Sequence, residues 1–266
     1  EFAARGRVKA FNASNGELLW TFFTVPGPGE VGFETWPANN DAWKTGGGTV
    51  WHTPAVDPDL GMIYFSTGNP GPDYNGSSRA GDNLFTASIV ALDVYTGEYR
   101  WHFQQVHHDI WDFDAPNPVV LFDLPYDGQV RKGLAQAGKT GWVYILDRTN
   151  GEPLVGIDEK SVPQEPRQIT SATQPIPVGD AFVSQTLDIP AEGFELANGG
   201  AIFTPFWEDP ILLRRSEANW PPSAVDPMSG IMYVCAGERQ AAYSTREGFE
   251  QVEPGERYVA GSMRFA

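Results

Sequence analysis

The 266-residue sequence has very little of several things that often define a protein class. Cys235 is its only cysteine, so no disulfide can form within the chain, and a lone thiol says little about redox compartment. No apolar run approaches the ~20 residues that a membrane-spanning helix needs. No stretch keeps an apolar period of 3.6 residues over three turns, which argues against long amphipathic helices.

Basic residues are scarce as well. The 18 lysines and arginines are outnumbered by 34 aspartates and glutamates, which gives a formal net charge of −16. A charge of this sign repels phosphate groups, so we expect no nucleic-acid partner and no binding to anionic membrane surfaces. A positively charged protein partner is compatible with it.

A signal peptide and an initiator methionine are also missing, because the sequence opens with Glu1 and runs directly into strand-like residues. Its last residues, YVAGSMRFA, stop without a closing turn. We therefore expect a piece of a longer chain, in which a missing targeting signal carries no information about location.

Glycine, proline and aromatic residues are abundant instead. The chain has 29 glycines, 22 prolines, nine tryptophans, nine tyrosines and 16 phenylalanines. Glycine and proline divide a chain into short elements, and aromatic side chains favour half-buried strands. The composition thus predicts many short strands joined by turns.

An internal repeat supports this prediction. The pattern Ala-x-Asp/Asn-x-x-x-Gly-x-x-x-Trp occurs in AFNASNGELLW from Ala10 and in ALDVYTGEYRW from Ala91, and a partial copy, ILDRTNGEPL, starts at Ile145. Each copy is typical of a strand, a tight turn and a second strand that ends in an aromatic residue. The two full copies are about two periods of roughly 40 residues apart, and 40 residues is the length of a propeller blade.

A second pair of segments has the same strand–turn–strand pattern: PAVDPDLGMIYFSTG from Pro54 and SAVDPMSGIMYVCAG from Ser223. With the repeat, it predicts an all-β fold, a β-propeller of four-stranded antiparallel blades. The alternative is a β-sandwich whose hairpins are similar by chance, but the Gly-to-Trp spacing recurs without slippage.

Four segments interrupt this pattern, and each has a structural and a functional interpretation. In TGGGTVW, three glycines would let the backbone approach a ligand and Trp51 offers a flat face to a planar ring; the alternative is a turn and a core aromatic. In STGNPGP, Asn69 is a turn former or a metal ligand through its amide oxygen. In GKTGWVYILDR, Lys139 is a surface lysine in a turn or a functional cation.

The fourth segment, HHDIWDFDAP, starts at His107 and has two carboxylates one residue apart. If it is extended, Asp112 and Asp114 point to one side, where they repel unless a metal, a basic side chain or solvent lies between them. Asp112 between two aromatic residues would be partly desolvated, which raises a carboxyl pKa and suits a general base; the alternative is an aspartate that caps a turn. His107 and His108 would point to opposite faces of a strand, which makes them a poor metal-ligand pair.

Together these segments resemble one family, the quinoprotein dehydrogenases that use pyrroloquinoline quinone (PQQ) on an eight-bladed propeller. The repeat resembles the tryptophan-docking motif of that family. The segments E-x-x-x-R-G, GGGT-x-W, GN-P, HD-x-WD, GKTG and NW-P follow the order of the family's site segments. The resemblance covers nearly the whole chain. It implies that residues 1–266 are part of a single PQQ-binding β-propeller domain whose N-terminal and C-terminal blades lie outside this sequence.

The resemblance implies a cofactor site. Trp51 matches the floor on which the quinone stacks, and Thr49 matches a nearby polar contact. Lys139 corresponds to a basic residue that hydrogen-bonds the quinone oxygens, and Asn219 in EANWPPS matches a further cofactor contact. Many alcohol-oxidising members also have a disulfide between adjacent cysteines over the quinone, or a CxxCH haem motif, and neither is present in this sequence.

The resemblance also implies a metal site and a catalytic base. Glu1 and Asn69 fall on metal ligands. Asp112 is expected to bind the same ion and also falls on the catalytic base, which takes the substrate's hydroxyl proton as hydride passes to the quinone. The implied ion is a hard cation, Ca²⁺ or alternatively Mg²⁺ or a lanthanide, that polarises the quinone carbonyl. Asp114 is similar to an additional carboxylate of lanthanide-dependent methanol dehydrogenases, which favours a trivalent ion. Otherwise Asp114 pairs with a basic group or binds a substrate hydroxyl.

The implied function is PQQ- and metal-dependent oxidation of an alcohol or sugar hydroxyl by a periplasmic dehydrogenase. Its electron acceptor would be a cytochrome c or a membrane quinone. The alternative is a non-catalytic propeller that acts as a scaffold for protein assembly, because PQQ-type repeats also occur in outer-membrane assembly factors. A scaffold needs the repeats but no metal ligands, base or quinone contacts, so the joint presence of these residues favours the enzyme.

Overall fold

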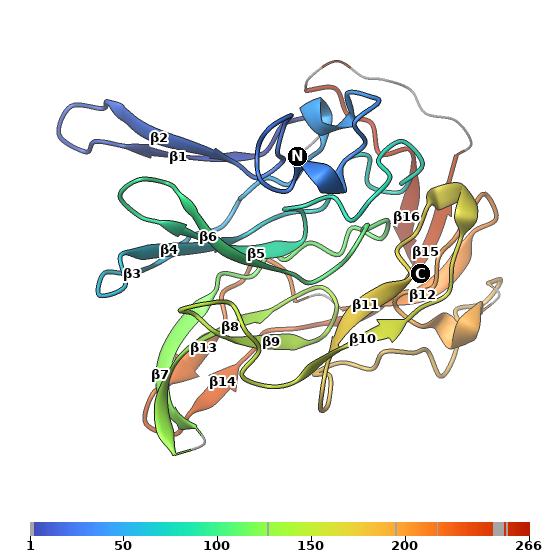
Figure 1. Ribbon diagram of the computed structural model, residues 1–266. Coiled ribbons are helices and arrows are strands. Elements are labelled where there is room, and N and C mark those ends of the chain that lie inside the picture. Colours follow the sequence, from blue (N-terminus) through green and yellow to red (C-terminus); the bar gives the residue numbers. More distant parts are fainter. Residues whose placement is uncertain (1–2, 127, 195, 217, 247–252, 254) are drawn as a thin grey trace.

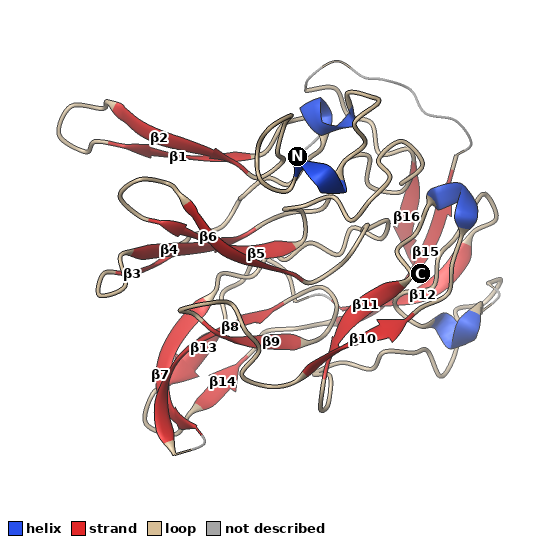
Figure 2. Cartoon of the chain, viewed as in Figure 1, coloured by secondary structure: helices blue, strands red, loops and turns tan. Residues whose placement is uncertain are grey.

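The fold is almost entirely β (Figures 1 and 2). The computed structural model describes these residues: 3–126, 128–194, 196–216, 218–246, 253 and 255–266. Their helical content is four short 3-10 helices, namely Phe33–Thr35, Ala42–Thr45, Pro166–Gln168 and Asn198–Gly200. No helix in these ranges is long and apolar enough to cross a membrane.

The strands form six antiparallel sheets, ordered β1-β2, β3-β4-β5-β6, β7-β8-β9, β10-β11, β12-β15-β16 and β13-β14. Their bounds are β1 (Arg7–Phe11), β2 (Leu18–Phe23), β3 (Ala55–Asp57), β4 (Met62–Ser66), β5 (Ser88–Asp93), β6 (Tyr99–Gln104), β7 (Val120–Tyr126), β8 (Gln129–Ala137), β9 (Val143–Asp147), β10 (Ile157–Ser161), β11 (Thr173–Pro177), β12 (Ile211–Ser216), β13 (Ala224–Asp226), β14 (Ile231–Tyr233), β15 (Glu238–Thr245) and β16 (Gly261–Phe265).

The sheet β3-β4-β5-β6 is a complete four-stranded blade between two other sheets (Figure 1). Its strand β5, SIVALD, has an unbroken apolar run because both of its faces are covered. Val90 and Leu92 pack toward β1-β2, whereas Ile89 and Ala91 pack toward β7-β8-β9. The predicted stacking of blades is therefore confirmed for the first three sheets along the chain.

The repeat tryptophans connect one sheet to the next, as the docking motif predicts. Trp20 lies at the end of the first copy, and its Nε1 donates a hydrogen bond of 3.2 Å to the carbonyl of Val94 in the second copy. The indole covers Gly97, where an added Cβ would lie 2.6 Å from the ring. The tryptophan of one copy of the repeat thus lies over the glycine of the next copy, one sheet further along the chain.

Trp101 repeats this contact one sheet further on. Its Nε1 donates to the carbonyl of Arg148 at 3.2 Å, and its ring covers Gly151, again 2.6 Å from the position of an added Cβ. The third copy is partial because Val155 occupies the position of the tryptophan. The docking series along the described chain accordingly ends at this sheet.

Of the six sheets that the described ranges contain, one has the four strands expected of a blade and the other five have two or three. In β7-β8-β9 the place of the fourth strand is taken by a single bridge between Leu146 and Pro153. Two backbone hydrogen bonds flank this bridge, from the Asp147 N–H to the Glu152 carbonyl at 2.7 Å and from the Leu154 N–H to the Ile145 carbonyl at 2.9 Å. The second predicted hairpin pair is confirmed: in β3-β4 and β13-β14, Asp57 and Asp226 cap their turns through Oδ1.

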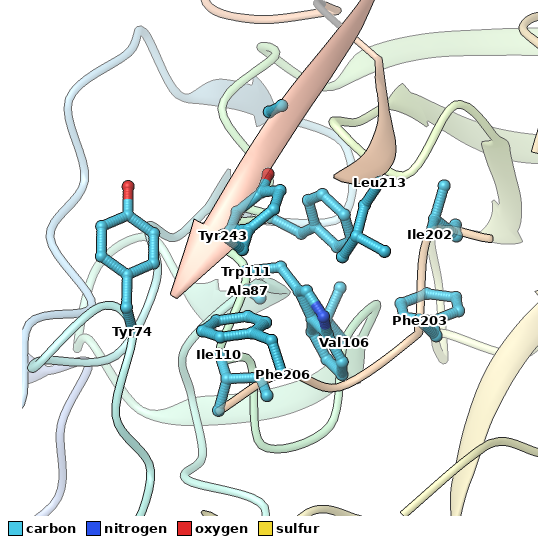
Figure 3. Packing of buried hydrophobic residues seen from close by; sticks show 12 residues of the cluster. Tyr74, Ala87, Val106, Ile110, Trp111, Ile202, Phe203, Phe206, Leu213 and Tyr243 are labelled. Carbon is cyan, nitrogen blue, oxygen red and sulfur yellow. The ribbon is translucent and has the colours of Figure 1, made fainter. Parts of the chain in front are cut away.

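The largest aromatic core cluster lies around Trp111 and Tyr243 (Figure 3). It brings together loop residues that follow β6 with strands β12 and β15, which are distant in sequence. Trp111 and Phe113 stack at 5.8 Å, and Phe203 meets both rings edge-on. The cluster therefore fixes the backbone on both sides of Asp112.

Candidate active site

One cavity of about 800 Å³ collects most of the residues that the sequence singled out. Its described lining is Thr49, Trp51, Asn69, Asp73, Tyr74, Asp112, Asp114, Lys139, Asn219, Arg257, Val259, Gly261, Ser262, Met263 and Arg264. All of the predicted cofactor, metal and catalytic residues are in this set except Glu1, which lies outside the described residues. The structure brings the other seven together on this lining.

The topology explains this convergence. In the blade β3-β4-β5-β6, the start of β3 and the ends of β4 and β6 lie at the same end of the strands, because neighbouring strands are antiparallel. Trp51 comes before β3, Asn69 follows β4 and Asp112 follows β6. Lys139 lies in the turn between β8 and β9, and Asn219 follows β12.

Trp51 provides a flat, partly open wall, with 37% of its surface exposed. The adjacent Gly68 keeps this wall close to the carboxylates, since an added Cβ would lie 3.3 Å from the Trp51 Nε1 and 2.9 Å from Asp114 Oδ1. The glycines of TGGGTVW have a different role from the one expected. An added Cβ on Gly47 would lie 2.6 Å from the carbonyl of Asn69, so that glycine makes room for protein backbone rather than for a ligand.

The HHDIWDFDAP segment is a compact loop and not an extended strand, which corrects the expected geometry. Asp112 has φ +60°, in the left-handed region that aspartate tolerates better than most residues. Asp109 caps this loop: its two carboxylate oxygens accept the backbone N–H groups of Trp111 (2.8 Å) and Phe113 (2.7 Å). The turn-capping role that was the alternative for Asp112 thus belongs to Asp109, whose pKa burial raises to about 6.

A basic side chain separates the two carboxylates, one of the three possibilities that the sequence left open. The ammonium group of Lys139 contacts Asp112 Oδ1 at 3.0 Å and also forms an ion pair with Asp114 Oδ2. Lys139 does lie in a turn, but it is only 6% exposed and is not a surface lysine. The other oxygen of Asp114 accepts the backbone N–H of Asn69 at 2.5 Å.

The two carboxylates have opposite pKa shifts. Burial alone would raise the pKa of Asp112, but Lys139 and Arg215 outweigh it and hold the pKa below its usual value. The expectation of a raised Asp112 pKa is therefore wrong, because no local pattern shows that both Lys139 and Arg215 lie against this carboxylate. Burial and the Asp112 charge raise the pKa of Asp114 well above its usual value despite Lys139. Asp112 is thus the carboxylate that its neighbours keep ionised at neutral pH.

Arg215 on β12 is the main functional residue that sequence reasoning missed. Its guanidinium forms an ion pair with Asp112 Oδ2 at 2.8 Å, and the side chain is almost completely buried. No motif marks it, since it lies in an ordinary strand, ILLRRS. The only available signal was the presence of two arginines in a strand that is otherwise apolar.

The donor chemistry fits a hard cation next to Asn69 and Asp112. The Asn69 amide nitrogen donates to the Pro70 carbonyl at 3.0 Å, and the amide oxygen accepts no hydrogen bond from any residue that the structure describes. An amide oxygen beside a carboxylate suits Ca²⁺ or a similar ion. The described residues contain no cluster of three His, Cys, Asp or Glu side chains that could hold a metal, so further ligands would come from the cofactor and the implied Glu1.

The remaining predicted contact, Asn219, is held on the cavity wall by Asn117. The Asn117 side-chain amide donates to the carbonyls of Asn219 (3.1 Å) and Pro221 (2.5 Å), and its oxygen accepts from the Ser223 hydroxyl at 2.9 Å. Asn117 is completely buried. It connects the loop that carries both aspartates with the NWPPS segment.

The two adjacent histidines have structural partners away from the cavity lining. His107 contacts Gln104 at 2.7 Å and Glu159 at 3.2 Å. Each ring nitrogen of His108 lies 2.7 Å from a backbone carbonyl, that of Gly81 or that of Gln168. They do not face a common point.

Comparisons with known proteins agree with this architecture. The family described as PQQ, glucose/ethanol/alcohol dehydrogenase, beta-propeller domain, matches residues 1–257. The fold and the site therefore define a PQQ-type dehydrogenase propeller, and the chain belongs to this family.

Individual relatives place the chain among quinoproteins. It is 36% identical over 255 residues to the quinoprotein alcohol dehydrogenase PedH of Pseudomonas putida. This match covers 90% of this chain and 40% of that protein. The quinohemoprotein alcohol dehydrogenase of Comamonas testosteroni superposes with a TM-score of 0.71 at 28% identity, over 98% of this chain and 39% of that one. A europium-containing methanol dehydrogenase superposes with a TM-score of 0.70 at 26% identity, over 100% of this chain and 45% of that one. The chain thus spans less than half of each of these relatives.

Proposed function

We propose that this chain is the PQQ-binding part of a metal-dependent dehydrogenase that oxidises the hydroxyl group of an alcohol. The observation that carries the proposal is the cavity in which Trp51, Asp112 and Lys139 meet. The names of the relatives, which are quinoprotein and quinohemoprotein alcohol dehydrogenases, support it. A scaffold would have no use for a buried carboxylate–ammonium cluster in an open cavity.

The residues fit the cofactor in shape and chemistry. A planar ring system would stack on Trp51, with Thr49 and Asn219 as polar contacts and Lys139 as the donor to its oxygens. When bound, the quinone supplies the oxidising power, and a metal ion beside Asn69 supplies the polarisation of its carbonyl.

Asp112 is the proposed general base. Its carboxylate lines the cavity, is 18% exposed and is kept ionised by the neighbouring cations, so it is available to take the proton of a substrate hydroxyl. Lys139 contacts the same carboxylate and would hold the base and the quinone oxygens in one place. Its pKa is raised because, although burial opposes its charge, Asp112 and Asp114 stabilise the ammonium form.

For the metal we propose a divalent ion, Ca²⁺, with Mg²⁺ and a lanthanide as alternatives. The case for a trivalent ion rested on an excess of carboxylates. In the described lining, however, Asp73, Asp112 and Asp114 are matched by Lys139, Arg257 and Arg264. The Asp114 side chain is only 2% exposed, against 18% for Asp112, and its Oδ1 accepts the Asn69 N–H, so we assign Asp114 as the partner of Lys139 rather than as a ligand.

We further propose a periplasmic enzyme that passes electrons to a cytochrome c or a membrane quinone. The quinohemoprotein names of several relatives support a cytochrome route for those proteins. The acidic composition of the chain is compatible with a basic protein partner.

The test is reconstitution of the full-length protein, prepared without cofactor and then loaded with PQQ and either Ca²⁺ or La³⁺. Reduction of an artificial dye is measured with primary alcohols and with aldoses, and protein without PQQ is the control. We expect dye reduction that requires both PQQ and a metal and that is faster with alcohols. Saturating PQQ binding without oxidation of any alcohol or aldose would contradict the proposal.

A further inference from the structure

The Asp112 loop is held from two sides. Asp109 takes the N–H groups of Trp111 and Phe113, as described above, while the carbonyls on this loop point the other way. Arg215 donates to these carbonyls: its NH1 donates to the Trp111 carbonyl at 2.8 Å, and its NH2 donates to the Asp112 carbonyl at 3.0 Å. Each nitrogen of the guanidinium fork thus contacts the backbone of the loop.

The same two nitrogens make one further contact each. NH2 also donates to Asp112 Oδ2 at 2.8 Å, and NH1 donates to the hydroxyl of Tyr243 at 2.8 Å. Arg215 therefore binds a backbone oxygen and a side-chain oxygen of the same residue. This pair of contacts fixes the direction of the carboxylate relative to its own backbone.

We propose that Arg215 is a positioning residue for the catalytic Asp112. The inference rests on the proposed function, because only then does the direction of this carboxylate matter. Arg215 would hold Asp112 Oδ2 so that Oδ1 faces Lys139 and the cavity, and Tyr243 would hold Arg215. Tyr243 is itself fixed in the aromatic core, with its ring 5.4 Å from that of Phe206 (Figure 3).

A lysine cannot replace this contact set. The guanidinium is planar and presents its donors in a rigid fork, whereas an ammonium has three donors at a single point. One ammonium cannot reach two backbone carbonyls, a carboxylate and a phenol from the position of Arg215. The substitution Arg215→Lys would keep the charge and most of the volume but release the direction of Asp112.

The neighbouring Arg214 provides a matched control. It lies on the same strand and is also buried, at 8% exposure, but it points to the opposite face. There its Nε donates to the Ser184 carbonyl at 3.1 Å and its guanidinium pairs with Glu238. Arg214→Lys changes a buried arginine in the same sheet without touching the Asp112 loop.

The test compares Arg215→Lys and Arg214→Lys in the full-length protein loaded with PQQ and Ca²⁺. For Arg215→Lys we expect kcat to fall about 10- to 100-fold, the size of a misplaced catalytic group. We expect KM and PQQ affinity to stay within about threefold, and the isotope effect with C1-deuterated alcohol to increase. In a crystal structure of Arg215→Lys, we expect the Asp112 carboxylate in a changed or split rotamer. Arg214→Lys should match wild type in all of these measurements.

The outcomes separate the two proposals. A wild-type protein with no PQQ-dependent oxidation would remove the proposed function itself. If the wild type is active, and Arg215→Lys has the same kinetics and an unchanged Asp112 rotamer, only the positioning role of Arg215 is overturned. If Arg215→Lys does not fold, Tyr243→Phe, which releases NH1, should lower kcat about 3- to 10-fold at unchanged PQQ affinity. An unchanged kcat in that variant would equally overturn the role of Arg215.

Discussion

The blade β3-β4-β5-β6 and the loop that follows it differ in what holds their residues in place. In the blade, apolar side chains alternate between two cores, and each tryptophan of the repeat covers a glycine of the next sheet. In the loop, Asp112 has a left-handed backbone and is fixed by charged groups from other parts of the chain. The blade is built by local pattern and the loop by distant partners. We infer that changes in the blade alter stability and that changes in the loop alter chemistry.

The largest expected effect is in the loop. Asp112→Asn keeps the shape of the side chain but removes the proton acceptor, so kcat should fall about 10²- to 10⁴-fold. PQQ affinity should change little, whereas the urea midpoint should fall, because the neutral amide leaves the buried Arg215 and Lys139 without the charge of Asp112. Steady-state kinetics with a PQQ titration on the same sample would check this. A variant with nearly wild-type turnover would assign the base to another residue.

The second effect belongs to the blade. Gly151→Ala places a methyl group against Trp101 at a residue with φ +80°, so we expect a loss of about 3 kcal/mol in the free energy of unfolding. Gly16→Ala is the matched control at the same repeat position, with φ +74° but nothing within 4 Å. It should cost only the strain of the left-handed backbone, about 1 kcal/mol. Urea unfolding of the full-length protein measures both, and equal losses would show that tryptophan docking contributes nothing.

The third effect concerns Asp114, at the border between the two regions. Asp114→Ala deprives Lys139 and the Asn69 N–H of an acceptor, which should lower stability by about 2 kcal/mol because Lys139 keeps Asp112 as a partner. As a structural partner and not a ligand, Asp114 should affect the Ca²⁺ and La³⁺ forms equally. Activity of wild type and variant with each ion is the measurement. A loss confined to the La³⁺ form would make Asp114 a lanthanide ligand.

The smallest effect is a pH dependence within the blade. Burial lowers the pKa of His102 on β6 to about 4, and Tyr99 contacts its Nδ1 at 2.7 Å. The unfolded chain then binds more protons than the folded chain between about pH 4 and 6.5, so stability falls as the pH drops through this window. His102→Gln should remove about 1 kcal/mol of this dependence, since water reaches part of the ring. Urea unfolding of both proteins at pH 7.5 and pH 4.5 measures the difference. If their free energies of unfolding fall by the same amount between the two pH values, His102 is not the source of this pH dependence.

Sequence reasoning predicted the blade better than the loop for a physical reason. The spacing from Gly16 to Trp20 and from Gly97 to Trp101 encodes a contact that repeats, so a pattern is enough to find it. The cavity residues Trp51, Asn69 and Lys139 were found because their motifs follow a family order. The contact of Arg215 with Asp112 joins chain segments about a hundred residues apart, which no local pattern records.

We propose that the cavity binds PQQ against Trp51 and Lys139 and presents Asp112 to the substrate. The most direct test is a crystal structure of the full-length protein with PQQ and Ca²⁺. We expect the quinone ring parallel to the Trp51 indole, its oxygens within hydrogen-bonding distance of Lys139 Nζ, and Asp112 facing the reactive carbonyl. A quinone bound outside this cavity would contradict the proposal. So would a quinone in the cavity that contacts neither Lys139 nor Asp112.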